Sequence, residues 1–506
     1  MRVISAEEAA WLVKDNWTIV PGGFGSCGHP DALSRAIGQR FQGHGHPRSL
    51  SLLFASAPGD GMGRGADLFA HVGLVSRAIG GFWGFVPGLG EMARKGQIEA
   101  HNWPQGVMSQ LFRAIAAGQP GVLSRIGLNT FVDPDLHGGR LNKAHGPALV
   151  KKLNAFDQPM LFYPSQRVDC ALLRGSFCDS DGNISMQNEV SYSDALAQAM
   201  AARNSGGIVV VQVEHLVGRH EIAPYDVRIP GMLVDYVVVS ASGDHPQTYG
   251  DAYDPEFTRA GHSRIVAQTV TTAERIIARR ALQELKSRSC RVVNLGIGIP
   301  ALIGQVAMED GQDMPVTLTV ESGQIGGTPA QGLSFGASRN PAALVEPAAL
   351  FEFYEGGGLD ATCLGFAELD SGGNVNVSRF GSRLKGAGGF INISQSAKNV
   401  FFCGTFTANG LETECDQGRL RIVAEGRARK FVSQVSHRTF SGTYAHERQQ
   451  NVRVITERAV FSIKNGTVFL DEIAPGISVN DDIIANINGS FVISGSCRNM
   501  DYALFR

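Results

Sequence analysis

One carboxylate in this sequence stands where a catalytic group is expected. Residues 318–327 read LTVESGQIGG, so an apolar strand pattern ends in Glu321 and a glycine-rich stretch follows at once. Ligands bind at the carboxyl ends of strands in α/β sheets, and a carboxylate there can be a nucleophile when the substrate is held in line with it. The same residues also fit a glutamate that only caps a turn, so this motif alone leaves both interpretations open.

A second candidate lies near the start of the chain. Residues 23–28, GFGSCG, fit the G-x-G-x-x-G pattern of dinucleotide-binding turns, between a strand pattern and a helix pattern. The acidic residue that such a site needs about 20 residues further on is missing, because Arg48 stands there. The sequence therefore disfavours a nicotinamide or flavin enzyme and favours a turn whose backbone, at Gly23 and Gly25, closely approaches another ligand or another element of the chain.

Two further patterns in the sequence are weaker candidates for a functional site. Residues 332–336, GLSFG, fit the G-x-S-x-G elbow of serine hydrolases, but the strand before it and the helix after it that the elbow requires are not indicated. The histidines at 44, 46, 215 and 220 lack the H-E-x-x-H spacing that places two ligands on one helix face. We therefore expect neither a serine hydrolase nor a metal site.

Composition sets the class of protein. The chain has 506 residues, 43% hydrophobic and 18% charged, and its net charge of −2 gives no broad basic surface for nucleic acid. The eight cysteines show no CxxC spacing, no 18-residue apolar run occurs, and the amino terminus has no signal-peptide pattern. These features predict a cytoplasmic enzyme that does not bind a membrane.

The elements that must position these residues occur twice. Each half begins with a helix pattern, continues with a short apolar strand and a glycine turn, and then has a proline that opens the next helix. The helix and strand patterns lie at 5–14 and 18–20 in the first half, and at 272–285 and 291–295 in the second.

A turn pattern repeats at a fixed distance. Residues 179–185, DSDGNIS, resemble residues 370–376, DSGGNVN, and both have the composition of a hairpin turn. The two halves predict duplicated α/β domains with mainly parallel sheets flanked by helices. We place the first domain at 1–255, a linker at 256–271 and the second domain at 272–506.

Several short motifs occur in an order that resembles the family I CoA-transferases. The resemblance is to the single-chain acetate/propionate CoA-transferases, which are related to 3-oxoacid CoA-transferases, and it covers almost the whole chain. The motifs are GGF at 22–24, NWPQG at 102–106, TFVDP at 130–134, VESG at 320–323, YEGGGLD at 354–360 and GAGGFIN at 386–392.

The resemblance implies two similar α/β domains with the active site at their interface. It implies that Glu321 is the nucleophile, that the Gly389 N–H stabilises an oxyanion and that the Gln105 side chain assists it. Coenzyme A would be substrate and covalent intermediate, with no permanently bound cofactor. The partners would be acyl-CoA and small carboxylic acids, and the enzyme would be a homo-oligomer. Residues implied in binding CoA or substrate are Gly23, Gly25, Gly357, Gly386 and Gly388.

Departures from the 3-oxoacid branch bear on the substrate. That branch has an asparagine near the segment 55–58, here ASAP, and an Asn after the nucleophile where this chain has Ser322. Both differences favour short-chain acyl groups over acetoacetate. A 3-oxoacid CoA-transferase and an acyl-CoA hydrolase on the same scaffold are the alternatives.

Overall fold

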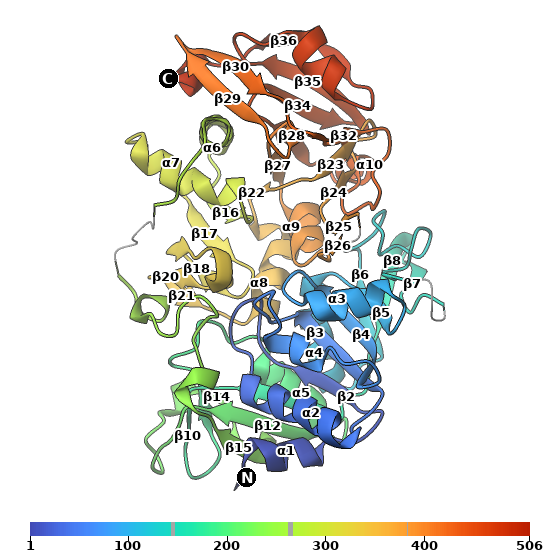
Figure 1. The fold of residues 1–506 in the computed structure, drawn as a ribbon, viewed down its shortest axis with the longest axis vertical. Helices are drawn as coiled ribbons and strands as arrows, with labels where there is room; N and C mark the ends of the chain where they lie inside the picture. The colour runs from blue at the N-terminus through green and yellow to red at the C-terminus, as the bar shows by residue number, and fades with distance from the viewer. Residues whose placement is uncertain (143–146, 262–266, 382) are drawn as a thin grey trace. The chain divides into compact units, whose positions relative to one another are not determined.

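The computed structural model describes residues 1–142, 147–261, 267–381 and 383–506 (Figure 1). Residues 262–266, inside the predicted linker, lie outside the described residues. The chain forms two compact units. Unit 1 comprises Met1–Ser263, Val320–Glu352 and Gly381–Asn392, and unit 2 comprises Arg264–Thr319, Phe353–Phe380 and Ile393–Arg506. Two short segments of the second half of the sequence therefore belong to the unit built by the first half.

Unit 1 is built on a sheet in which every neighbouring pair of strands is parallel. The strands in spatial order are β1 (Arg2–Val3), β15 (Tyr236–Val239), β12 (Ile208–Val213), β9 (Cys170–Arg174), β2 (Thr18–Pro21), β3 (Leu50–Ser56), β4 (Val75–Phe82) and β5 (Glu99–Asn102). The central strands β12, β9, β2 and β3 are short, mostly apolar and largely buried, as parallel strands covered on both faces must be, whereas the edge strand β1 is exposed.

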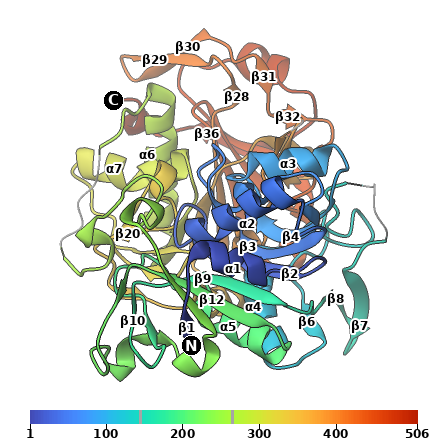
Figure 2. The ribbon, with the colours of Figure 1, turned by 60° about the horizontal axis from the view of Figure 1, so that its bottom comes forward.

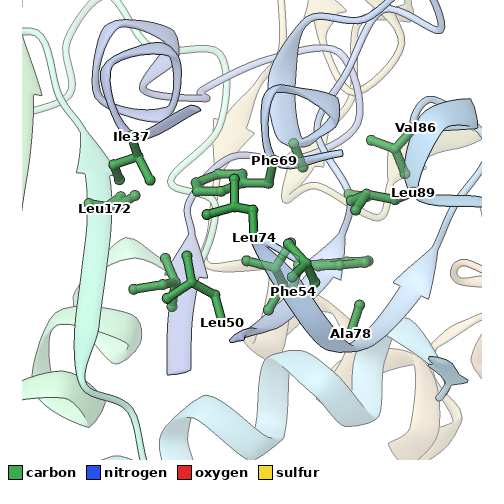
Figure 3. Packing of buried hydrophobic residues seen from close by; sticks show 14 of the residues in the cluster. Ile37, Leu50, Phe54, Phe69, Leu74, Ala78, Val86, Leu89 and Leu172 are labelled. Carbon is green, nitrogen blue, oxygen red and sulfur yellow. The ribbon is translucent and has the colours of Figure 1, made fainter. Parts of the chain in front are cut away.

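Helices cover both faces of this sheet. Figure 3 shows the core on one face, where Ile37 lies against Leu172 and Phe69 lies among Leu50, Leu74 and Phe54. The helices on this face are α1 (Ala6–Leu12), α2 (Asp31–His44), the 3-10 turn Gly65–Phe69 and α3 (Pro87–Arg94). Figure 2 shows α1 and α2 in front of the strands. Two helices that are absent from this core, α4 (Gln105–Ala116) and α5 (Ala195–Asn204), contact β3, β4, β9 and β12 and cover the other face.

The first expected helix and strand are confirmed. Helix α1 begins after Ser5, whose hydroxyl accepts a hydrogen bond from the Glu8 N–H while the Glu8 carboxylate accepts one from the Ser5 N–H. This reciprocal capping satisfies two backbone donors that a helix end leaves unpaired. The strand β2 and the glycine turn follow as predicted.

Unit 2 has its own sheet. Its strands in spatial order are β17 (Thr317–Val320), β16 (Val292–Leu295), β22 (Ala361–Leu364), β27 (Asn399–Cys403), β33 (Asn451–Ile455), β34 (Ala459–Lys464), β35 (Thr467–Ile473) and β36 (Val492–Asn499). The first five are parallel, and β34 and β35 continue the sheet as antiparallel strands. Helix α6 (Thr272–Ser287) packs on this sheet and begins with the same capping arrangement, from Thr271 and Glu274.

The order and register of the central strands show the duplication. The order β15-β12-β9-β2-β3 of unit 1 matches β33-β27-β22-β16-β17 of unit 2. In unit 1 Cys170 pairs with Ile208, and in unit 2 Ala361 pairs with Asn399, each residue 191 positions after its counterpart. The expected class, two similar α/β domains with mainly parallel sheets flanked by helices, is confirmed.

The repeated turn also has one register in both halves. Strands β10 (Phe177–Cys178) and β11 (Ile184–Ser185) form the first hairpin, and β23 (Glu368–Asp370) and β24 (Val375–Asn376) form the second. In each, one aspartate carboxylate accepts hydrogen bonds from two N–H groups of the turn that follows it. The aspartate of each turn motif is therefore explained by local hydrogen bonding.

Candidate active site

Glu321 directly follows strand β17 and is half-buried. The residues after it are fully buried and tied down: the Ser322 hydroxyl lies 2.7 Å from the Gly336 carbonyl oxygen, and the Gln324 amide donates to the same oxygen at 2.7 Å. Because the neighbours carry these bonds, the backbone that presents Glu321 is held in one position.

A segment of the first half, residues 190–194, supports this loop from within unit 1. The Ser191 hydroxyl donates to the Ser322 carbonyl oxygen at 2.6 Å, and the Gln324 amide donates to the carbonyl of Val190. Ser193 and Asp194 both have a positive φ, of 49° and 58°. Such strain in non-glycine residues persists only where the surroundings enforce it, and it concentrates at functional sites.

Asp194 connects the loop to the helix that begins with Gln105. Its carboxylate accepts from the Ser109 hydroxyl of α4 at 2.6 Å and from the Ala348 N–H at the start of α8 (Pro347–Phe353) at 3.3 Å. One buried carboxylate therefore links α4, the segment 190–194 and the stretch that follows Glu321.

Two carboxyl groups of this region resist ionisation. Burial raises the pKa of Asp194 to about 6. Burial, together with the nearby Asp194 charge, raises the pKa of Glu346 to about 7. Both groups are therefore more easily protonated in the folded chain than in the unfolded chain, so their protonated forms favour folding.

We expect Asp194→Asn to weaken the pH dependence of stability. The contribution of these two carboxyls to the free energy of unfolding falls as pH rises from about 4 to 7, because both must ionise while buried. For Asp194 this loss amounts to roughly 3 kcal/mol, and the amide variant does not incur it. Urea unfolding between pH 4.5 and 7.5 measures the effect.

The control for that change is Asp157→Asn. Asp157 also has a positive φ, of 60°, but it is exposed, so this variant should keep the wild-type pH dependence. Equal pH profiles for Asp194→Asn and the wild type would contradict the assignment of Asp194 as a buried carboxyl that resists ionisation.

The glycine loop 386–389 lies against the end of strand β4. The Gly388 N–H donates to the Gly81 carbonyl oxygen at 2.8 Å, and Phe82 forms an isolated antiparallel bridge with Gly386. A Cβ on Gly386 would lie 2.9 Å from the Trp83 ring, so a larger residue would push the loop away from the strand. Gly389, which directly precedes α9 (Phe390–Ser396), is buried in this loop.

Gln105 lies beside this loop. Its N–H donates to the Gly388 carbonyl oxygen at 3.1 Å, and its side-chain oxygen would be 3.6 Å from a Cβ on Gly388. Gln105 is 2% exposed, and within the described part of the chain its side-chain nitrogen is buried without a hydrogen-bond partner. An unpaired buried donor costs about 1–3 kcal/mol, a cost that a ligand oxygen accepting from it would offset.

Two asparagines that the sequence reasoning did not single out join the motifs NWPQG and GAGGFIN. The Asn102 side-chain oxygen accepts from the Ala387 N–H at 2.8 Å, and the Asn392 side-chain oxygen accepts from the Gly106 N–H at 3.0 Å. Both are fully buried. The only sign of these asparagines in the sequence was their position inside two motifs of the resemblance. Each side chain accepts a hydrogen bond from the backbone of the other motif and so holds that motif in place.

The glycine turn at 23–28 and the G-x-S-x-G pattern at 332–336 pack against each other. Phe24 and Cys27 of the first glycine turn form a small buried core with Ala330 and Ala337, and Phe335 packs on it. A Cβ on Gly25 would lie 3.4 Å from the Phe335 carbonyl oxygen. The turn at 23–28 therefore approaches the chain that follows Glu321 closely, so its glycines do not by themselves indicate a dinucleotide site.

Ser334 lies in a 3-10 turn, and the helix that an elbow requires does not follow it. Its hydroxyl lies 2.5 Å from an Asp251 carboxylate oxygen and 2.9 Å from the Thr248 hydroxyl, and neither partner is a histidine base. This environment is that of a structural serine.

The structure thus places seven of the eight predicted site residues in unit 1, on segments that Asp194 and the loop contacts connect. They are Gln105, Glu321, Gly389, Gly23, Gly25, Gly386 and Gly388. Gly357 belongs to unit 2, in the turn after α8, where its φ is 95°.

The described residues contain no group of three or more His, Cys, Asp or Glu side chains placed to hold a metal ion. No helix in the described ranges is both long and apolar enough to cross a membrane.

Glu321 thus stands at the end of a strand of an α/β fold, and the loop 386–389 and Gln105 belong to the same compact unit. Comparisons with known proteins give the class of protein. Residues 3–240 match the family described as Coenzyme A transferase. The chain is 42% identical to acetate CoA-transferase YdiF of Escherichia coli K12, over 99% of this chain and 95% of that protein. It is 41% identical to caffeate CoA-transferase of Acetobacterium woodii, over 100% of this chain and 97% of that protein.

Solved structures show the same relationship. The crystal structure of the acyl-CoA transferase YdiF apoenzyme from E. coli O157:H7 superposes with a TM-score of 0.93 at 41% identity, covering 100% of this chain and 96% of that one. A YdiF thioester complex with CoA gives a TM-score of 0.92 at 40% identity, with the same coverage. This chain belongs to the coenzyme A transferase family and is a CoA-transferase.

Proposed function

We propose that this enzyme transfers CoA from a short-chain acyl-CoA to acetate or propionate through a thioester on Glu321. The observation that carries the proposal is the unpaired, buried amide of Gln105 beside the loop 386–389, in the same compact unit as Glu321. The names of the full-length relatives, an acetate and a caffeate CoA-transferase, support the class of reaction.

The chemistry requires no general base. An ordinary glutamate, with a pKa near 4.3, is about 99% ionised at pH 7. The Glu321 carboxylate attacks the thioester carbonyl, which gives an acyl-glutamyl anhydride and CoA thiolate. The thiolate then attacks the glutamyl carbonyl and releases the first acid, leaving CoA on Glu321. An acceptor carboxylate reverses these steps.

Each addition step creates an oxyanion that needs hydrogen-bond donors already in place. The Gly389 N–H, at the start of a helix, has no intrahelical partner to satisfy. The Gln105 amide supplies a second donor, held by the packing of α4 and by the bond to Gly388. We assign both to the oxyanion, and Gly386, Gly388, Gly23, Gly25 and Gly357 to the close approach of CoA or substrate.

The proposal also includes a homo-oligomer in the cytoplasm, where thiols stay reduced. All eight cysteines are unpaired, which fits that compartment.

Mass spectrometry after incubation with acyl-CoA alone tests the mechanism. We expect the mass of CoA on a single peptide, the one that contains Glu321. An adduct on Cys27 or Ser334 instead would overturn the assignment. Free CoA that accumulates steadily without an acceptor acid would favour an acyl-CoA hydrolase, and initial-rate lines that intersect when both substrates vary would exclude the ping-pong scheme.

The acyl preference should depend on the segment 55–58, which contains the last two residues of strand β3 and the two that follow. Residues 55–58 are buried and carry no side-chain amide, and the Ala55 carbonyl oxygen would lie 2.3 Å from a Cβ on Gly81, the residue that binds Gly388. A β-keto oxygen would lose water there without a side-chain amide to donate to it, at roughly 1–3 kcal/mol.

Acetyl-, propionyl- and butyryl-CoA should therefore exceed acetoacetyl-CoA in kcat/KM by about 5- to 150-fold with acetate as acceptor. Acetoacetyl- or succinyl-CoA ranking first would assign the chain to the 3-oxoacid branch. Caffeoyl-CoA ranking first would replace the short-chain assignment with that of the Acetobacterium relative.

A further inference from the structure

Four buried polar residues of unit 1 have no part in the mechanism above. They are Arg174, Glu189, Gln212 and His245, each at most 4% exposed. Arg174 is the last residue of strand β9, Gln212 lies near the end of β12, and the two strands are neighbours in the sheet. The cluster therefore lies at the carboxyl ends of adjacent parallel strands, the edge where α/β sheets bind their ligands.

Glu189 is the centre of this cluster. Its carboxylate accepts from the Arg174 guanidinium at 2.8 and 3.0 Å and from His245 Nε2 at 3.0 Å. Although burial raises the pKa of Glu189, the Arg174 charge and the bond from His245 lower it to about 2. In the described part of the chain the four residues have no buried side-chain polar atom without a partner, and a fully satisfied buried network is rigid.

The partners of His245 indicate which ring nitrogen carries the proton. The Gln212 side-chain oxygen accepts from the Ala32 N–H at 3.0 Å, so the Gln212 amide nitrogen is the group that faces His245 Nδ1, at 3.2 Å, as a donor. Burial lowers the pKa of His245, against the raising effect of the nearby carboxylates, so the ring is neutral. A neutral imidazole that accepts at Nδ1 donates from Nε2, and this donor is directed at Glu189.

Glu189 directly precedes the segment 190–194, which supports the Glu321 loop. Two residues after Glu189, the Ser191 hydroxyl donates to the Ser322 carbonyl oxygen at 2.6 Å. Because a single residue separates Glu189 from Ser191, a shift of the Glu189 backbone is passed to Ser322, the neighbour of Glu321. The cluster can therefore act on the nucleophile without touching the substrate.

The duplicated sheet of unit 2 does not contain this cluster. With the offset of 191 residues between the two sheets, Arg174 corresponds to Gly365 and Gln212 corresponds to Cys403. The fold therefore forms these strand ends with small, uncharged residues as well. A buried ion pair is often no more stabilising than apolar residues that fill the same space, so stability alone does not account for the cluster in unit 1.

We propose that Glu189 and His245 are positioning residues for CoA transfer. The hydrogen bond from His245 Nε2 fixes Glu189 and the segment 190–194, and the bond from Ser191 then holds the Glu321 loop in line with the thioester carbonyl. The inference rests on the proposed function in taking Glu321 as the nucleophile. Its loss should lower kcat rather than weaken substrate binding, because the cluster sets the position of the attacking group.

Two substitutions of His245 separate the bond to Glu189 from the other contacts of the ring. His245→Asn places an oxygen at the position of Nδ1, where it can accept from Gln212, but the side chain is too short to reach Glu189. His245→Gln places its amide nitrogen at the position of Nε2 and restores the donor to Glu189. Both side chains are neutral, like the imidazole, so neither changes the charge beside Arg174.

We expect His245→Asn to lower kcat with acetyl-CoA and propionate about tenfold at unchanged KM, since a misplacement of about 1 Å costs roughly 10²-fold and one lost bond allows a smaller shift. His245→Gln should restore kcat to within about twofold of the wild type. The rate at which the CoA mass appears on Glu321 in a single turnover should follow the same order.

The control for a purely structural effect is Glu472→Gln. Glu472 is also a buried carboxylate, 5% exposed, that accepts from an arginine, Arg280, at 2.8 Å, but it lies on strand β35 of unit 2. Arg280 keeps its bond to Glu284 in this variant. Glu472→Gln should therefore lower the melting temperature and leave kcat unchanged.

Two results would overturn the proposal. A His245→Asn variant with the kcat of the wild type, whatever its melting temperature, would show that the cluster is only structural. Equal losses of kcat in His245→Asn and His245→Gln would show that the bond to Glu189 is not the contact that matters. With the CoA mass on Glu321 in the wild type, either result leaves the proposed function standing, whereas CoA on another residue would overturn both.

Discussion

Glu321→Gln lowers kcat by about 10⁴-fold or more if Glu321 is the nucleophile, as the loss of a nucleophile does in other enzymes. The amide keeps the shape of the side chain but has no charge with which to attack a thioester. The fold should tolerate it, since Ser322 and Gln324 carry the bonds that hold this loop. Steady-state rates with acetyl-CoA and propionate measure the loss.

Glu321→Asp is the matched variant for position. It keeps the charge and withdraws the carboxylate by one methylene, and a misplacement of about 1 Å costs roughly 10²-fold. We therefore expect kcat to be highest in the wild type, lower in Glu321→Asp and lowest in Glu321→Gln. A Gln variant within tenfold of the wild type would exclude Glu321 as the nucleophile.

Gly323→Ala should cost about 10²-fold in kcat through displacement of the same loop. Gly323 has a φ of 113°, and a Cβ there would lie 2.0 Å from the Val345 carbonyl oxygen. That oxygen belongs to a backbone whose N–H donates to the Gly323 carbonyl at 2.9 Å, so the clash cannot be relieved by rotating a side chain. The loop must move by about 1 Å to restore van der Waals contact.

The control is Gly332→Ala, which also places alanine at a positive φ, of 60°, but with no atom within 4 Å of the new Cβ. Equal losses in both variants would mean that backbone strain, not the clash, lowers the rate. Ser191→Ala removes the hydrogen bond to Ser322 without a clash, and a drop in its kcat at unchanged KM would show the positioning effect in a variant that folds normally.

Much of the architecture could be predicted because its signals are local. The capped helices and the two hairpins depend on residues within four positions of each other, such as Ser5 with Glu8. The duplication was detectable because the turn motifs at 179–185 and 370–376 keep the aspartate that the hydrogen bonds of each turn require. The position of Glu321 at a strand end is equally local.

Tertiary structure alone decided which segments meet. The partner of Ser322 lies 131 residues away at Ser191, and the partner of Ala387 lies 285 residues away at Asn102. The sequence-based boundary between 255 and 272 separates halves of the chain, while unit 1 also includes the segments Val320–Glu352 and Gly381–Asn392 of the second half.

The raised pKa values of Asp194 and Glu346 likewise had no signal in the sequence. A pKa depends on the water excluded and the charges within several ångströms of the group, and these come from chain segments far apart in sequence. The sequence by itself determined which residues could react, since reactivity begins with the side-chain type. The fold decided which of them are desolvated, held and paired, because those properties belong to neighbours in space.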